Sequence, residues 1–237
     1  MVLLSGWEWV INRGLVPPFI LPSPAQIYQS LIENRQQLFA VHLPVTLEEV
    51  CIGFIFSVAG GIVLGIAMYL SRTMEKLLYP FLVVSQTIPL VAISPIFMMW
   101  FGYTIWSKVA IIILTAFFPI VISIYDGLKT VDTSYQNLFQ TMGASRRIMF
   151  QKLLIPMALP QFLSGLKLTI VYCVTGATIG EWLGASAGLG YFSRRMSGNL
   201  EAAAVFASVF LLAALGVVLF LFVTFAEKKF LKYKTRT

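Results

Sequence analysis

Long uncharged stretches separated by short polar segments dominate this chain of 237 residues. A helix needs roughly 20 apolar residues to cross the hydrocarbon core of a bilayer, which is about 30 Å thick. Five stretches reach or approach that length: 50–70, 77–107, 109–125, 162–183 and 202–226. The second is long enough to cross the membrane and to carry an extra segment. The pattern predicts an all-α polytopic membrane protein with five clear transmembrane helices.

The first 38 residues have a different character. Residues 1–11 are apolar apart from Glu8 and too short to cross a bilayer, so they form either an interfacial segment or the end of a partial first span. Residues 16–24 contain four prolines, which exclude a helix and indicate an extended connector. Residues 25–38 predict a short amphipathic helix at the membrane surface.

The composition supports a membrane protein of one domain. Hydrophobic residues make up 58% of the chain and charged residues 11%, whereas soluble domains have about 45–50% and about 25%. Because so few charges cannot cover the surface of a soluble protein, we expect a single transmembrane domain over residues 1–237. The net charge of +7 would indicate a nucleic-acid partner only if the basic residues shared one polar face.

The basic residues instead report the orientation of the chain in the membrane. If the five spans alternate in direction, twelve lysines and arginines lie on one side: Arg72, Lys76, Lys129, Arg146, Arg147, Lys152, Lys167, Lys228, Lys229, Lys232, Lys234 and Arg236. Five lie on the other: Arg13, Arg35, Lys108, Arg194 and Arg195. Cytoplasmic loops carry the excess of Lys and Arg. We therefore expect a cytoplasmic C-terminus, a cytoplasmic middle segment and no nucleic-acid partner.

Residues that carry site chemistry are scarce. The chain has one histidine, His42, and two cysteines, Cys51 and Cys173, and these cannot form a zinc cluster, a disulfide framework or a Cys/His nucleophile pair. No G-x-x-x-x-G-K-[ST] phosphate loop is present in the sequence. We therefore expect no metal, no bound cofactor and no ATPase site of the chain's own.

The middle segment, about 126–161, has the pattern of two short helices. Thr133 and Gln136 fit a capping box that begins the first helix. One apolar stripe follows at helical spacing: Tyr135, Leu138, Phe139 and Met142. Gly143 can end this helix and Ser145 can cap a second one, which we expect to end before Pro156. The segment forms either a docking knob at the cytoplasmic surface or an amphipathic connector that lies on the membrane.

The spacing within this segment resembles that of a known family. Gly143, nine further residues and then Leu153-x-Ile155-Pro156 is similar to the signature E-A-A-x3-G-x9-I-x-L-P of permease subunits in binding-protein-dependent ATP-binding-cassette (ABC) importers. Asn137-Leu138-Phe139 stands where that signature has E-A-A. In the family this region forms coupling helices that fit a cleft of the ATPase subunit. The resemblance implies these coupling residues: Leu138, Phe139, Met142, Gly143, Ala144, Ser145, Arg146, Arg147 and Pro156.

Residues 15–24, the Pro89/Pro95 region and residues 181–190 also resemble this family, in its branch that imports sulfonates, nitrate and thiamine precursors. The resemblance implies a MetI-like permease architecture in the bacterial inner membrane, and a first span that ends near Trp7-Glu8-Trp9. It also implies a homodimer that works with two ATPase subunits, which use the ATP, and an extracytoplasmic solute-binding protein. The substrate would be a thiamine-precursor pyrimidine or a sulfonate-like compound.

Polar residues inside apolar stretches are candidates for the translocation path. Proline frees backbone carbonyls, which are tolerated at membrane depth only inside protein or beside water. We expect these side chains to line the path: Ser85, Gln86, Thr87, Pro89 and Ser94, with Glu181 near its external mouth. The alternatives are a kinked but fully packed helix and an interfacial carboxylate without a special role.

Glycines at a spacing of four residues predict close helix packing. Gly176, Gly180, Gly184 and Gly188 form one such series, and the resemblance to a homodimeric family places it near a dimer axis. Packing within one subunit is the alternative, and it is the favoured interpretation for Gly61 and Gly65.

Three classes of function are compatible with a polytopic chain. The permease of an ABC importer explains both the missing phosphate loop and the organised cytoplasmic segment. A secondary transporter independent of an ATPase is the alternative, although paired ionisable residues at mid-membrane and inverted repeats are not evident in the sequence. An intramembrane enzyme would need a nucleophile or base constellation that a single histidine does not provide.

Overall fold

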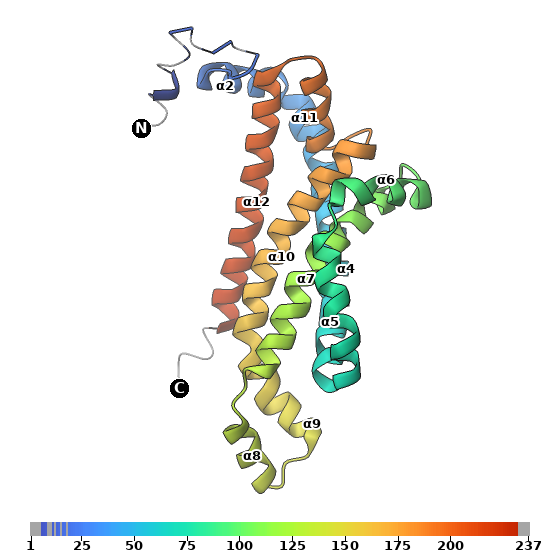
Figure 1. Cartoon of the computed structure of the whole chain (residues 1–237). Coiled ribbons are helices and arrows are strands. Elements are labelled where there is room, and N and C mark those ends of the chain that lie inside the picture. The colour runs from blue at the N-terminus through green and yellow to red at the C-terminus, as the bar shows by residue number, and fades with distance from the viewer. Residues whose placement is uncertain (1–5, 9–10, 12, 15, 18, 232–237) are drawn as a thin grey trace. The chain divides into compact units, whose positions relative to one another are not determined.

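A computed structural model describes residues 6–8, 11, 13–14, 16–17 and 19–231, and these are almost entirely helical (Figure 1). The predicted partial first span lies largely outside them. The helices from residue 24 onward are α2 (Pro24–Glu33), α3 (Arg35–Gln37), a π-helical turn (Leu38–His42), α4 (Leu43–Leu70), α5 (Arg72–Thr87), α6 (Leu90–Phe101), α7 (Ile105–Lys129), α8 (Thr133–Thr141), α9 (Arg146–Met149), a second π-helical turn (Phe150–Leu154), α10 (Ile155–Gly184), α11 (Leu189–Gly198) and α12 (Ala202–Leu231).

Four helical stretches of the described chain are long and apolar enough to cross a membrane: Arg35–Leu70, Ile105–Lys129, Arg146–Gly184 and Ala202–Lys229. The pair α5 and α6 provides a fifth span if the two helices are counted together. The all-α membrane fold is thus confirmed, with four or five spans. Within the uncharged stretch 77–107, which was expected to carry an extra segment, the chain leaves the helix at Ile88 and Pro89 and divides into α5 and α6.

The first described span begins earlier than the apolar pattern predicts. The expected surface helix 25–38 is only α2, and the π-helical turn leads from α3 directly into α4. The apolar pattern stops at Glu48 and Glu49, whereas the helix continues through both residues. Glu49 is fully buried and lies against Lys108, so an apparent polar boundary is part of the packed helix.

The helix after Ser145 also continues further than expected. The sequence predicted that it would end before Pro156, but α9 passes through the second π-helical turn into α10. Pro156, which has no backbone N–H to donate, follows the π-helical turn almost directly. The wider turn directly before it changes the hydrogen-bond pairing at this position.

The described chain forms two compact units, each assembled from three sections. The first contains Met1–Ile52, Leu90–Ile111 and Val174–Val217, and the second contains Gly53–Pro89, Ile112–Cys173 and Val218–Thr237. Four long helices, α4, α7, α10 and α12, therefore contribute residues to both units. Each unit has its own packing and is described separately below.

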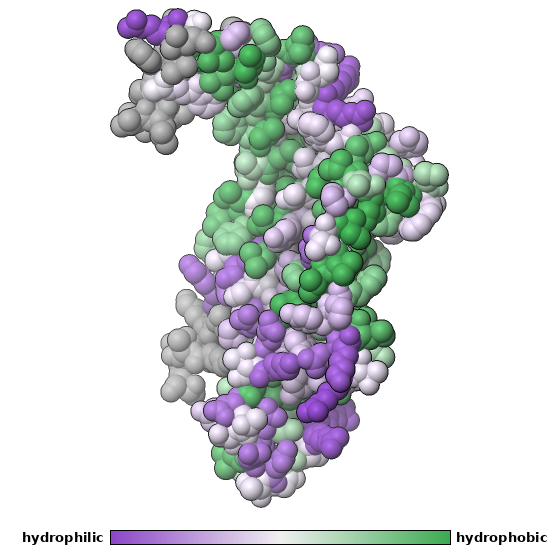
Figure 2. All heavy atoms as spheres, viewed as in Figure 1, coloured by the Kyte–Doolittle hydropathy of each residue, from purple (hydrophilic) through white to green (hydrophobic). Residues whose placement is uncertain are grey.

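Apolar side chains of α7, α10 and the second π-helical turn form the core of the second unit. The main cluster consists of Ile120, Ile124, Leu128, Val131, Leu153, Leu154 and Ala158. A second cluster joins α4, α5 and α7 through Met68, Leu82, Val121 and Tyr125. In Figure 2 hydrophilic residues gather around α8 and α9, whereas hydrophobic side chains cover large areas elsewhere on this face, as expected for a protein surrounded by lipid.

Two glycines of α4 allow it to approach α7 closely within the second unit. A Cβ on Gly61 would overlap Ile120, and a Cβ on Gly65 would lie 2.9 Å from the carbonyl oxygen of Val121. This confirms that both glycines pack within the chain. Gly60, the neighbouring residue, has open space around it.

We predict that Gly65→Ala destabilises the protein and that Gly60→Ala does not. The new methyl group of Gly65→Ala would press on backbone that cannot turn away, at a cost of about 1–3 kcal/mol. At Gly60 the higher helix propensity of alanine is the only change. Thermal unfolding of the two purified variants in one detergent measures the difference, and equal melting temperatures would contradict the close packing of α4 on α7.

Candidate functional site

The segment of α8 and α9 lies within the stretch predicted to couple to an ATPase, and its residues 132–149 are called the coupling segment after that prediction. It begins at a side-chain cap. Asp132 is the N-cap of α8 and accepts a hydrogen bond from the Ser134 backbone N–H at 2.8 Å. This backbone donor lowers the pKa of the Asp132 carboxyl. The predicted capping box of Thr133 and Gln136 is wrong, since the Gln136 side chain donates instead to the carbonyl of Val131. The aspartate one residue upstream provides the stronger, charged acceptor.

The predicted glycine elbow between the two helices is confirmed. Gly143 has φ +76°, a conformation that favours glycine. Its N–H donates to the carbonyl of Gln140, and the Ala144 N–H donates to that of Phe139, which is the Schellman pattern of a helix end. Ser145 then caps α9 by accepting a hydrogen bond from the Ile148 N–H. Two helices joined by a hydrogen-bonded turn make a defined shape.

The coupling segment has an inner and an outer face. On the inner face, Phe139, Met149 and Phe150 pack against the main cluster of the second unit. On the outer face the exposed apolar side chains are Tyr135, Leu138, Met142 and Ile148. The segment is thereby fixed to α7 and α10, while about half to three-quarters of the surface of each outer side chain is exposed.

The other predicted coupling residues differ in exposure. Gly143, Ser145, Arg146 and Arg147 are exposed, Ala144 is half-buried, and Pro156 is half-buried in α10. A groove of about 590 Å³ includes three of them and is lined by Tyr69, Leu70, Gln140, Ala144, Arg146, Arg147, Met149, Phe150 and Leu154. This groove thus combines apolar side chains with two guanidinium groups.

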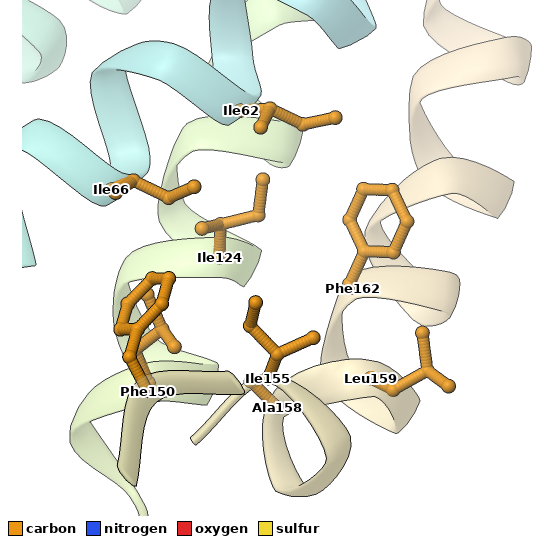
Figure 3. Close-up of a pocket in the computed structure, with 9 residues that line it drawn as sticks. Ile62, Ile66, Ile124, Phe150, Ile155, Ala158, Leu159 and Phe162 are labelled. Atoms are coloured by element: carbon orange, nitrogen blue, oxygen red, sulfur yellow. The ribbon is translucent and has the colours of Figure 1, made fainter. Parts of the chain in front are cut away.

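A wholly apolar cavity of about 210 Å³ lies where α4, α7 and α10 meet in the second unit (Figure 3). Its labelled residues are Ile62, Ile66, Ile124, Phe150, Ile155, Ala158, Leu159 and Phe162, and Leu128 also lines it. Phe150 borders both this cavity and the groove beside the coupling segment. Apolar side chains of α4, α7 and α10 thus line a space next to the base of the coupling segment.

A polar contact that the sequence analysis did not anticipate joins α5 to the end of α7. Lys129 Nζ lies 2.9 Å from Glu75 Oε1, and the Tyr125 hydroxyl contacts both groups. Tyr125 and Lys129 lie 50 and 54 positions after Glu75 in the chain. Only the fold brings them together, and the contact fixes the helix end from which the coupling segment departs.

The predicted path residues fall into two groups. Gln86, Thr87 and Pro89 are exposed, at the point where α5 ends. Ser85, Ser94 and Glu181 are buried within the chain, and the assignment of these residues to a translocation path stays a prediction. The two serine hydroxyls donate to the carbonyls of Leu82 and Val91 in their own helices, which satisfies them locally.

Glu181 is held by the turn between α10 and α11 in the first unit. Its carboxylate accepts hydrogen bonds from the Thr46 hydroxyl at 2.6 Å and from the Gly190 backbone N–H at 2.5 Å. Gly190 lies in the first turn of α11, whose N-cap, Gly188, has no side chain to provide a cap. The carboxylate therefore serves as a cap from another helix, at the end of α11 where a negative charge is favourable.

Further hydrogen bonds hold the same turn. The Gly188 N–H donates to His42 Nδ1 and the Leu189 N–H donates to the Thr46 hydroxyl oxygen. Ser208 of α12 donates to the carbonyl of Leu189 at 2.7 Å. We call Glu181, Thr46, His42 and this turn the buried clamp. Sequence reasoning identified Glu181 but not its partners, because Thr46 and His42 look unremarkable at the start of a distant helix.

A second ionic contact lies beside the buried clamp. Lys108 Nζ of α7 is 3.1 Å from Glu49 Oε1 of α4, and both side chains are at least nine-tenths buried. The sequence analysis counted Lys108 among the basic residues outside the membrane spans, and the structure shows that it lies inside a packed helix. A charge pattern that counts loop residues cannot reveal such an internal pair.

The series of four glycines does not form one helical stripe. Gly176, Gly180 and Gly184 belong to α10, but Gly188 follows its end and has φ +116°. Gly180 packs on Lys108, Gly184 packs on Met98, and a Cβ on Gly188 would overlap the Glu181 carboxylate. These contacts within the chain support the alternative interpretation of packing inside one subunit.

Comparison with known proteins identifies the family. Residues 57–232 match the family described as binding-protein-dependent transport system inner membrane component. The chain belongs to this family. It is accordingly the membrane permease subunit of an ABC importer, as the sequence analysis predicted.

Several relatives match over nearly the whole chain. The formylaminopyrimidine transport permease protein ThiX of Halalkalibacterium halodurans is 47% identical over 92% of this chain and 86% of its own length. The putative aliphatic sulfonates transport permease protein SsuC of Bacillus subtilis is 30% identical over 98% and 85%. The taurine transport system permease protein TauC of Escherichia coli is 30% identical over 92% and 82%.

A solved structure shares the fold. The inward-facing MetNI methionine ABC transporter includes a chain that superimposes with a TM-score of 0.67 over 81% of this chain and 94% of its own length, at 20% identity. This likeness supports the MetI-like architecture, and at such low identity it carries information on the fold alone.

We predict that Gly188→Ala destabilises this permease while Gly198→Ala leaves it unchanged. Position 188 combines φ +116° with direct overlap on the Glu181 carboxylate, whereas Gly198 of α11 has open space around it. Backbone strain alone costs about 1–3 kcal/mol. Thermal unfolding in detergent compares the variants, and a Gly188→Ala protein as stable as Gly198→Ala would show that the buried clamp does not constrain the turn.

Proposed function

We propose that this permease imports a thiamine-precursor pyrimidine of the formylaminopyrimidine class, with the coupling segment as the docking site of its ATPase subunit. An extracytoplasmic binding protein delivers the solute, and ATP bound by the partner ATPases supplies the energy. The docking site is inferred from the amphipathic surface of residues 132–149. A capped and hydrogen-bonded turn holds this surface outward, and its inner side chains pack on α7 and α10.

The geometry of the coupling segment suits the transmission of movement. Its inner face is joined to the cluster that contains α7 and α10, so a displacement of its outer face would be transferred to both helices. Its exposed apolar residues Leu138, Met142 and Ile148, with Arg146 and Arg147 beside them, offer the mixture of apolar area and guanidinium groups that is enriched at protein interfaces.

The proposed orientation places the coupling segment and the C-terminus in the cytoplasm. Arg146, Arg147 and Lys152 lie in or next to the coupling segment, and Lys228 and Lys229 lie in the last turn of α12. The positive-inside rule favours the cytoplasmic side for both groups. That side is also where ATPase subunits would have access to ATP.

We further propose a homodimer in the bacterial inner membrane. Because Gly180 and Gly184 are covered by their own chain, the dimer contact would use other surfaces. Many large apolar side chains are exposed. In α12 only 6% of the most apolar 18-residue stretch is buried, so this helix can face either lipid or a second subunit.

The docking site is tested by a double substitution on the coupling segment, with an exposed methionine elsewhere as the control. Met142 on the coupling segment is 75% exposed and Met99 on α6 is 84% exposed, so Met→Ala should leave the fold intact at either position. We predict that Leu138→Ala with Met142→Ala weakens binding of the ATPase subunit about tenfold or more, which corresponds to about 1.4 kcal/mol or more. Met99→Ala should bind like the wild type.

Affinity of detergent-purified permease for its ATPase subunit, measured on an immobilised surface, separates the outcomes. Wild-type affinity of the Leu138/Met142 variant would place the docking site elsewhere on the molecule. Equal losses in this variant and in Met99→Ala would indicate a general effect on the protein rather than a local contact.

The substrate class is tested by competition. The support is the identity of 47% with a formylaminopyrimidine permease, against 30% with the sulfonate and taurine permeases. In vesicles that contain the permease, its ATPase and its binding protein, we predict that unlabelled formylaminopyrimidine reduces uptake of the labelled compound at concentrations at least tenfold lower than taurine does. Stronger competition by taurine would reassign the transporter to the sulfonate-type substrates.

A further inference from the structure

Three ionisable side chains of the first unit are buried together on three helices. Glu49 of α4 and Glu181 of α10 are 0% exposed and Lys108 of α7 is 7% exposed. All three lie in helices that are long and apolar enough to span a membrane. If each were ionised, the group would carry a net charge of −1 away from water, and uncompensated charge in such a place is costly.

The two carboxyl groups differ in the donors around them. Glu181 accepts hydrogen bonds from the Thr46 hydroxyl and the Gly190 N–H. Among the residues that the structure describes, neither oxygen of Glu49 has a hydrogen-bond partner. The Lys108 ammonium group approaches Glu49 Oε1 alone, at 3.1 Å, so Glu49 Oε2 is a fully buried oxygen without any donor.

Glu49 and Glu181 also lie in the same neighbourhood. Thr46, three residues before Glu49 on α4, donates to Glu181, and Gly180, next to Glu181 on α10, packs on Lys108, which contacts Glu49. Two ionised carboxylates are acceptors only and repel each other, and one lysine compensates only one of them in a buried site. One proton shared by the two carboxyl groups removes the excess charge.

We propose that Glu49 and Glu181 form a buried proton-binding site, in which Glu49 carries the proton and donates it to the Glu181 carboxylate. Glu181 then accepts three hydrogen bonds, from Thr46, Gly190 and Glu49. The negative charge of Glu181 and the positive charge of Lys108 cancel, so the group of three is neutral. Glu49 Oε2, the oxygen without a donor, becomes the hydroxyl that donates to the Glu181 carboxylate.

The position of α11 identifies Glu49 as the residue that is protonated. The Gly190 N–H in the first turn of α11 donates to Glu181, and a helix N-terminus stabilises a negative charge. A protonated Glu181 would lose that stabilisation and weaken the charge-assisted bond from Gly190. The other titratable groups nearby are His42 and Arg195. His42 already accepts a hydrogen bond from the Gly188 N–H, and the positive charge of Arg195 acts on His42.

The proton has a structural consequence within the first unit. It completes a chain of contacts from Lys108 through Glu49 to Glu181, and from Glu181 into the first turn of α11. Loss of the proton would leave two buried negative charges with one lysine between them and weaken the packing of α4 against the end of α10. The site is thus a point where proton concentration acts on the packing of this permease, independently of the ATPase docking proposed above.

Infrared difference spectroscopy tests the proposal on the whole chain in lipid nanodiscs at neutral pH. We expect the C=O band of a protonated carboxyl group, with a shift in deuterium oxide, in the wild type. The band should be absent in both Glu49→Gln and Glu181→Gln, since each leaves one carboxylate beside Lys108. It should persist in Glu75→Gln, which removes the carboxyl of the exposed Glu75–Lys129 pair in the second unit.

A second measurement uses the link between proton binding and stability. If the folded protein holds one proton more than the unfolded protein, its folding equilibrium constant falls as the pH rises, by up to tenfold per pH unit. Glu49→Gln supplies an amide donor in place of the proton, so this dependence should be flatter in that variant than in the wild type. Glu75→Gln should keep the wild-type dependence.

A wild type without a protonated-carboxyl band, or a band that survives in both Gln variants, would overturn the proposal. The same holds if the Glu49→Gln variant retains the full wild-type dependence of stability on pH. None of these readouts involves transport or the ATPase, so their failure is distinguishable from a failure of the proposed function.

Discussion

A buried carboxylate needs hydrogen-bond donors, and the arrangement of the first unit follows from meeting that need for Glu181. Its donors come from Thr46 of α4 and from the first turn of α11. The turn between α10 and α11 must then bring its backbone close to the carboxylate, which only glycine permits at position 188. One satisfied charge thereby determines the entry into α11, the contact of α4 with α10 and the identity of a glycine.

The second unit solves a different problem, which is to hold an exposed segment in a fixed shape. Its apolar cluster anchors the inner face of α8 and α9, while Asp132, Gly143 and Ser145 satisfy the helix ends by hydrogen bonds within the segment. The outer face consequently does not depend on further contacts for its conformation. A docking surface with its shape already fixed loses little conformational entropy on binding, which suits the role proposed for this segment in transmitting movement.

Sequence patterns succeeded wherever one local rule had no competitor. Apolar length located the spans, and Gly143 with Ser145 located the elbow of the coupling segment. The patterns failed where two local rules competed. Asp132 displaced Thr133 as the cap because a carboxylate is the better acceptor. The π-helical turn before Pro156 allowed α9 to continue into α10, although a proline usually ends a helix.

The sequence by itself determined the class of molecule: an all-α membrane protein, without a phosphate loop, that resembles ABC importer permeases. These properties depend on composition, on apolar length and on motifs of neighbouring residues. Only the tertiary structure decided the roles of Glu49, Lys108 and Glu181. Thr46 and Glu181 are 135 positions apart and His42 and Gly188 are 146 apart. The partner of a buried charge is chosen by packing in space, and no periodicity along one helix encodes it.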